Sequence, residues 1–202
     1  MRFWRDLGIV SAVLIVVSQV SAQPGVPHVQ RPQERIFHEG YSFVIPDEVG
    51  WTLIERSSYL LALARSGDGP DETHAIRAGL SSLPPFKTIE DFAHVVREEI
   101  VRNTDPQRFK ISKIEAAAYA GKTTDCVKSH SVAEDHSVRR RSAATGTMIL
   151  ERLALACPHP SNKNIGVNVE YSQRYNPGKA DPRFLEKGMT VLNSIEFTFT
   201  RF

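Results

Sequence analysis

Residues 122–157 decide most of the fold, and they read KTTDCVKSHSVAEDHSVRRRSAATGTMILERLALAC. Two segments with strand character, 122–134 and 147–157, flank a polar and basic middle, 136–146. Two strand-like runs separated by a polar stretch are typical of a β-hairpin. We predict that the two segments pair as antiparallel strands around this loop.

The pairing predicts a register through the two cysteines of the chain, Cys126 and Cys157. Cysteines that lie directly opposite each other bridge most easily at a narrow, non-hydrogen-bonded pair. If they do so here, the numbers of paired residues sum to 283, and the loop is centred near Arg141. Two of the resulting pairs are His130 with Leu153 and Glu134 with Ile149.

Two alternatives to a disulfide remain: the cysteines are buried free thiols, or they are metal ligands. Neither cysteine has the C-x-x-C partner of a zinc site, and His159 is the histidine near Cys157. An oxidising compartment would favour the disulfide. A bridge that closes about 30 residues would stabilise the fold by roughly 3–4 kcal/mol.

The beginning of the chain predicts such a compartment. Arg2 and Arg5 precede the apolar run Leu7 to Val17, and Val20-Ser21-Ala22 offers small residues to a signal peptidase. This is the pattern of a cleaved secretory signal. An uncleaved membrane anchor is the alternative, but a spanning helix needs roughly 20 apolar residues, and Ser18 interrupts this run. We predict that residues 1–22 are a signal peptide and that the protein is periplasmic or secreted.

The remaining chain fits one domain. Residues 23–35 hold three prolines and are predicted to form a flexible leader, followed by a single domain over 36–202. Without residues 1–22, the chain carries 23 basic and 22 acidic side chains. That balance provides no overall field for nucleic acid or an anionic membrane. No second apolar run approaches spanning length, so we expect no stable membrane span after cleavage.

Strand patterns dominate the domain, and two helices interrupt them. The first helix, 89–102, has Thr88 as its expected N-cap, and the second follows Asp181-Pro182 and contains Gly188. The predicted strands are 41–45, 51–55, 59–65, 74–80, 109–118, 122–134, 147–156, 166–173 and 195–200. We predict an α+β domain with one antiparallel sheet that has a face covered by helices.

Motifs for catalysis are missing from the sequence. The chain holds no G-x-S-x-G turn for a nucleophilic serine. Neighbouring carboxylates such as Glu98-Glu99 point apart, so they build no acid–base pair. The run from Ala116 to Gly121-Lys122-Thr123 resembles a phosphate-binding loop, but it lacks the first glycine, and we interpret it as a turn between strands. We predict neither enzymatic activity nor a cofactor.

Two groups of residues are candidates for binding. His130, Glu134 and His136 share one face if a strand runs through them, and nitrogen and oxygen ligands of this kind suit a first-row divalent metal. In an extended chain the outer two lie about 20 Å apart, too far for one ion unless the loop folds back. The run Arg139-Arg140-Arg141 lies in the hairpin loop. It is either a solvated tip or a contact for an acidic partner.

The order of the elements resembles the PsbP-like group, which is related to the Ran-binding Mog proteins and the bacterial DcrB-type periplasmic proteins. Tyr41-Ser-Phe-Val-Ile-Pro46 followed by Gly50-Trp51 is similar to the opening of that group, and the similarity covers about residues 41–200. The resemblance extends over the helix at 89–102, the strand Val169 to Tyr175, a second helix and the closing strand from Ile195. It implies an α/β/α sandwich, with two or three helices flanking a twisted antiparallel sheet, and a non-catalytic binding or assembly role.

These observations predict an exported, non-catalytic binding or assembly module of the cell envelope, whose partner is a protein or another envelope component. The alternative is a metal-binding protein or metal-dependent hydrolase that uses His130 and His136.

Overall fold

A computed structural model describes residues 28–29, 31–122, 124–138 and 140–198. The predicted signal peptide and residues 23–27 and 30 of the predicted leader lie outside these ranges. Within the leader, His28–Val29 form a short strand that pairs with a later one, and Arg35 begins another. Among the described residues, no helix is both long and apolar enough to cross a membrane.

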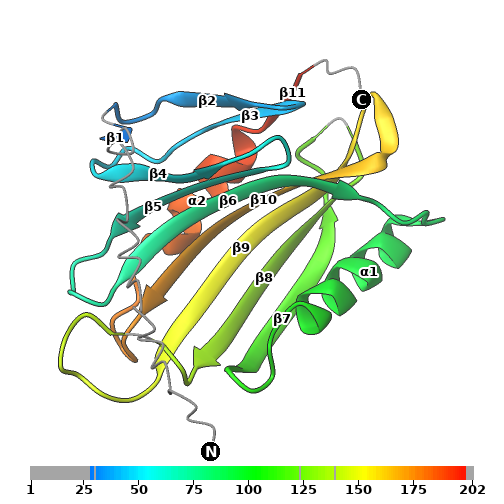
Figure 1. The fold of residues 1–202 in the computed structure, drawn as a ribbon. Coiled ribbons are helices and arrows are strands. Elements are labelled where there is room, and N and C mark those ends of the chain that lie inside the picture. Colours follow the sequence, from blue (N-terminus) through cyan, green and yellow to red (C-terminus); the bar gives the residue numbers. More distant parts are fainter. Residues whose placement is uncertain (1–27, 30, 123, 139, 199–202) are drawn as a thin grey trace, which may run out of the picture.

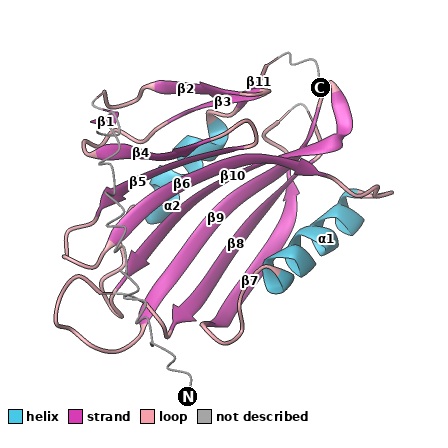
Figure 2. Ribbon diagram, in the orientation of Figure 1, coloured by secondary structure: helices cyan, strands magenta, loops and turns pink. Residues whose placement is uncertain are grey.

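The described part of the protein is mostly β, with 48% of its residues in strands and 14% in two helices (Figure 2). The strands are β1 (His28–Val29), β2 (Arg35–His38), β3 (Tyr41–Val44), β4 (Trp51–Arg56), β5 (Leu60–Ser66), β6 (Thr73–Ser82), β7 (Phe109–Tyr119), β8 (Cys126–Asp135), β9 (Met148–His159), β10 (Asn162–Tyr175) and β11 (Glu196–Phe197). The helices are α1 (Ile89–Arg102) and α2 (Phe184–Asn193).

Two antiparallel sheets make up the fold (Figure 1). The large sheet has the strand order β1-β4-β5-β6-β10-β9-β8-β7, and the small one has the order β11-β3-β2. The predicted hairpin is confirmed as β8 and β9, with His130 opposite Leu153 and Glu134 opposite Ile149. Because β7 is last in the order, one side of this strand is an edge of the sheet.

The main core lies between the two sheets, where α2 packs against β9, β10 and β3. Phe184 of α2 stacks on Tyr171 of β10, and both side chains are buried. Gly188 lets the helix approach the sheet closely, because a Cβ there would lie 2.8 Å from Leu153 Cδ2 and 3.2 Å from Tyr171 Cδ1. This close approach explains why glycine occupies position 188, although glycine destabilises a helix by about 1 kcal/mol relative to alanine.

The other helix, α1, lies on the opposite face of the large sheet and packs against β7 and β8 (Figure 1). Thr88 caps it as predicted: its hydroxyl accepts from the N–H of Asp91, whose side chain accepts from the N–H of Thr88. The helix covers one side of this face and leaves the part over β6, β10 and β9 uncovered by any described element.

The predicted α/β/α sandwich is therefore wrong. An α/β/α sandwich needs a layer of helices on each face of the sheet. The described residues form a single helix on each face. On the inner face α2 shares the cover with a second, three-stranded sheet, and on the outer face α1 covers one edge. The strands β6 to β10 are 10 to 14 residues long, so the large sheet takes up much of the described chain and few residues remain for helices.

Candidate functional site

The predicted disulfide is confirmed. Cys126 and Cys157 are joined by an S–S bond of 2.13 Å, with their Cα atoms 4.3 Å apart. Both residues are 1% exposed and belong to the core beneath α2. The bond ties the start of β8 to β9, next to the turn that connects β7 and β8. Gly121-Lys122 lies in this turn, as predicted, and Thr123 lies outside the described residues.

The three predicted metal ligands do not converge. His130 Nε2 lies 2.7 Å from Glu151 Oε1, and its Nδ1 lies 3.3 Å from Lys113 Nζ. His136 pairs with Glu134 instead, with 3.3 Å between Nε2 and Oε2. Within the described part of the chain, no three His, Cys, Asp or Glu residues gather as a metal site. The strand stays extended through Asp135, so the fold-back that the metal hypothesis needs does not occur.

His130 is part of a polar network beneath the start of α2. Glu151, its partner, also accepts from Gln173 and Tyr175. Gln173 in turn accepts from the N–H of Asp181, whose carboxylate binds Lys187. Lys187 also binds Glu48, which pairs with Arg65. The network borders a polar cavity of about 230 Å³. Its three carboxylates all have partners within the protein, so it holds α2 on the sheet.

The predicted binding loop contains an anchor. Arg139 lies outside the described residues. The Arg140 side chain is 8% exposed, lies 3.4 Å from Asp71 Oδ2 and donates to Asn176 at 2.8 Å. Asp71 also accepts from the N–H groups of Arg141 and Ser142 and from the Ser142 hydroxyl. Hydrogen bonds from Ser142 above all lower the pKa of Asp71 to about 2. Arg140 is thus a structural residue, and Arg141 is the exposed arginine of the described loop.

We expect Arg140→Ala to lower the thermal midpoint of unfolding by more than about 2 °C, because it leaves Asp71 and the loop without this contact. Arg141→Ala is the matched control, and it should leave the midpoint unchanged because exposed charges contribute little. Calorimetry on both variants checks this. Equal midpoints for the two variants would show that the anchor adds no stability.

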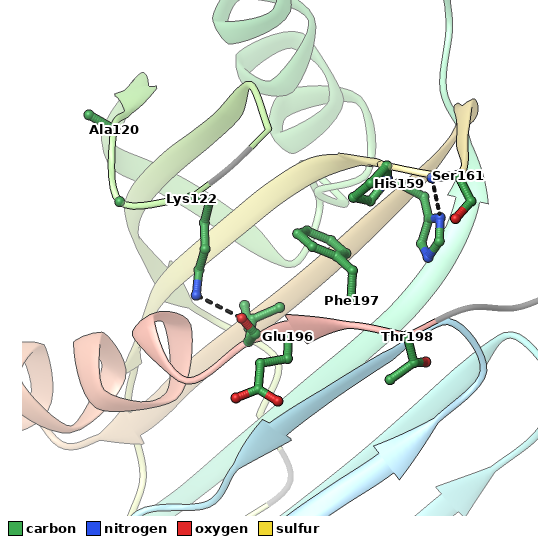
Figure 3. A pocket seen from close by; sticks show the side chains of 10 residues that line it. Ala120, Lys122, His159, Ser161, Glu196, Phe197 and Thr198 are labelled. Atoms are coloured by element: carbon green, nitrogen blue, oxygen red, sulfur yellow. Dashed lines mark hydrogen bonds between the residues drawn. The ribbon is translucent and has the colours of Figure 1, made fainter.

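Another hollow has its lysine and its histidine already engaged by the protein backbone (Figure 3). It measures about 710 Å³ and lies between the β7–β8 turn, the end of β9 and β11. Lys122 Nζ donates to the carbonyls of Asn193 and Ile195, at 2.6 and 2.8 Å, and so binds the C-terminal end of α2. His159 Nε2 lies 2.9 Å from the Gly40 carbonyl, and its Nδ1 accepts from the N–H of Ser161. The arrangement positions backbone segments.

Unlike the lysine and the histidine of this hollow, the free edge of β7 is not engaged by another described element of the protein. Its first half carries Lys110, Lys113 and a bulge between Ile111 and Lys113, which are features that protect sheet edges from pairing. Its second half holds Ala116-Ala117-Ala118, which has neither charge nor bulge. This half of the edge is open to another strand.

The backbone groups of the open half point outward. A Cα distance of 4.3 Å between Cys126 and Cys157 is that of a non-hydrogen-bonded pair. The N–H and C=O of Cys126 therefore point toward Tyr119, its partner in β7. By alternation along β7, the N–H and C=O groups of Ala116 and Ala118 point away from β8.

A groove of about 390 Å³ follows this open half, between β7 and α1. From α1, the apolar residues Ile89 and Ala93 and the polar residues Glu90, His94 and Arg97 line it. His94 lies 3.2 Å from Glu98, whereas Arg97 has no ion pair with any residue in the described ranges. The sequence analysis assigned these alanines to the strand 109–118 but did not identify that strand as an edge of the sheet, because strand order depends on contacts between distant segments. A run of small, uncharged residues in a strand predicted next to a helix was the available signal.

Comparison of the sequence with protein-family models and with curated proteins gave no match.

Proposed function

We propose that this protein is an exported, non-catalytic binding module that captures an extended segment of another envelope protein along the open half of β7. The observation that carries the proposal is the outward-pointing backbone of Ala116 and Ala118, which borders a groove under α1. Unpaired N–H and C=O groups at this spacing match the backbone of an added strand. Alanine side chains allow that strand to approach without a steric obstacle.

The groove carries charges of both signs. Arg97 and Glu90 both line it, and neither forms an ion pair within the described ranges. Lys110 and Lys113 follow the same edge, but they pair with Glu134 at 3.9 Å and with Glu115 at 3.1 Å. A captured segment with a carboxylate near its end would pair with Arg97. Such contacts are exposed, so they guide the partner and add modest affinity.

Two further findings support an exported binding protein. The Cys126–Cys157 disulfide is of the kind that persists in oxidising compartments. Several polar groups of the network beneath α2 and of the hollow in Figure 3, among them Lys187, Lys122 and His159, are bound by other groups of the protein. Their arrangement supports binding and assembly over catalysis.

Replacing Ala116 and Ala118 together with proline should weaken capture about fivefold or more. Proline removes two outward N–H donors and leaves the β7–β8 ladder intact, because those donors do not point at β8. Each lost hydrogen bond costs about 0.5–1.5 kcal/mol. A photo-crosslinking amino acid at Ala93, in the native host, would report capture as the yield of a covalent adduct identified by mass spectrometry.

The double serine variant of Ala116 and Ala118 is the matched control, because it keeps both N–H groups and should keep the adduct. A crosslinker at Val101, exposed on α1 outside the groove, should give no such adduct. If the proline variant folds with a normal thermal midpoint and gives the wild-type adduct yield, the β7 edge is not the binding site.

A further inference from the structure

The uncovered part of the outer sheet face carries a second hollow, on the other side of α1 from the groove. It measures about 240 Å³, and strands β6, β8, β9 and β10 form its floor. Figure 1 shows α1 along one side of this floor, beside β7. The floor includes the small residues Ser129, Ala154 and Ala156. Glu170 of β10 is the acidic residue of the floor, and in the sheet it lies between Arg77 and Ala154.

Glu170 has no partner in the described ranges, where no side chain forms an ion pair or hydrogen bond with its carboxylate. Burial raises the pKa of Glu170, although the charges of Arg152 and Arg77 act in the opposite direction. Burying a carboxylate without a hydrogen-bond donor is costly, and such a group in a hollow is a candidate for binding a ligand.

Two arginines flank this carboxylate without binding it. Arg77 of β6 is directly opposite Glu170 in the ladder, and Arg152 of β9 lies two residues from Ala154, the other neighbour of Glu170. Opposite charges in such positions ordinarily pair across the strands. Here Arg77 is exposed and unpaired within the described residues. Arg152 donates instead to the hydroxyls of Ser131 and Thr104, at 3.1 and 3.4 Å.

We propose that this hollow binds a small zwitterion with an ammonium and a carboxylate close together, namely a free amino acid or a short peptide. The ammonium would bind Glu170, and the carboxylate would bind Arg77 and the remaining N–H groups of Arg152. A simple anion would meet the charge of Glu170, and a simple cation would meet two arginines. The volume of about 240 Å³ has room for a ligand of this size.

Titration calorimetry with L-alanyl-L-alanine on the mature protein tests the site. Glu170→Gln and Arg77→Gln should each weaken binding more than tenfold, because each removes one charged partner of the ligand. Arg183→Gln, far from this hollow on the loop before α2, is the matched control and should bind normally. Glu170→Gln should also fold with unreduced stability, since it removes an unpaired charge.

Variants of the probe separate the two ends of the ligand. N-acetyl-alanyl-alanine lacks the ammonium and alanyl-alanine amide lacks the carboxylate, so both should bind more than tenfold more weakly. Free L-alanine distinguishes an amino-acid site from a peptide site. Affinity should fall as the pH drops through the raised pKa of Glu170, with Arg77, Arg152 and Glu99 the charged groups that face it. Absence of binding at millimolar dipeptide, or wild-type affinity in Glu170→Gln, would overturn the proposal.

Discussion

Replacing Cys126 and Cys157 with alanine should lower the free energy of unfolding by more than about 3–4 kcal/mol. The disulfide spans 31 residues, and a cross-link of this length restricts the unfolded chain by about that amount. The loss of two buried sulfur atoms adds to it, since both residues lie in the core. Urea unfolding followed by circular dichroism measures the change as a lower midpoint.

Reduced wild-type protein is the control that separates the two contributions. It keeps both sulfur atoms and loses the cross-link, so it should fall between the oxidised protein and the alanine variant. If the reductant leaves the urea midpoint of the wild type unchanged after complete reduction, the cross-link does not stabilise this fold.

Asp135→Asn should cost about 2–3 kcal/mol of stability at neutral pH. The side chain of Asp135 is 0% exposed and accepts two hydrogen bonds from Arg108, at 2.9 and 2.8 Å, while Arg174 lies 3.2 Å away. Removing one member of a buried pair typically costs about 3–5 kcal/mol. Arg108 and Arg174 are 37% and 27% exposed, so they can turn toward water and reduce the loss.

The pH dependence checks the electrostatic origin of this loss. Burial acts to raise the pKa of Asp135, but the hydrogen bonds from Arg108 and the charge of Arg174 outweigh it and lower the pKa. A carboxyl with a lowered pKa in the folded state stabilises above its unfolded pKa of about 3.9 and loses this effect as the pH falls further. The stabilities of wild type and Asp135→Asn should therefore converge below about pH 4.

Urea titrations of both proteins between pH 2 and 7 measure this convergence. Asp68→Asn, on an exposed turn, is the matched control and should follow the wild type throughout. A gap between wild type and Asp135→Asn that stays constant to pH 2 would show that shape, rather than charge, matters at Asp135.

Local patterns in the sequence predicted the hairpin well. The positions of Cys126 and Cys157, together with the polar segment between the strands, determine the register, and the structure has the predicted pairs. Thr88 and Asp91 likewise indicated the start of α1. The second helix begins at Phe184, later than Asp181-Pro182 predicted, because Asp181 binds Lys187 and the N–H of Arg183 in the turn before the helix.

The layers of the fold depend on contacts between distant segments, which sequence patterns do not specify. Tyr41 and Phe43 predicted a strand but not that it belongs to a second sheet covering α2. The same limit applies to the sites. In the sequence, Arg140 cannot be distinguished from other loop arginines. Its partner Asp71 lies in the turn before β6, which only the fold places beside it. Glu170 and Arg77 lie 93 positions apart in the sequence, and the β6–β10 register makes them neighbours.

The disulfide also has a mechanical consequence. Tyr119, at the end of the open half of β7, pairs with Cys126, so the covalent bond to Cys157 lies directly behind the segment where a partner would attach. A pull on the captured segment passes from β7 to β8 through hydrogen bonds and from β8 to β9 through a covalent bond. Under tension, β7 should peel away first, while β8 and β9 stay joined at that end.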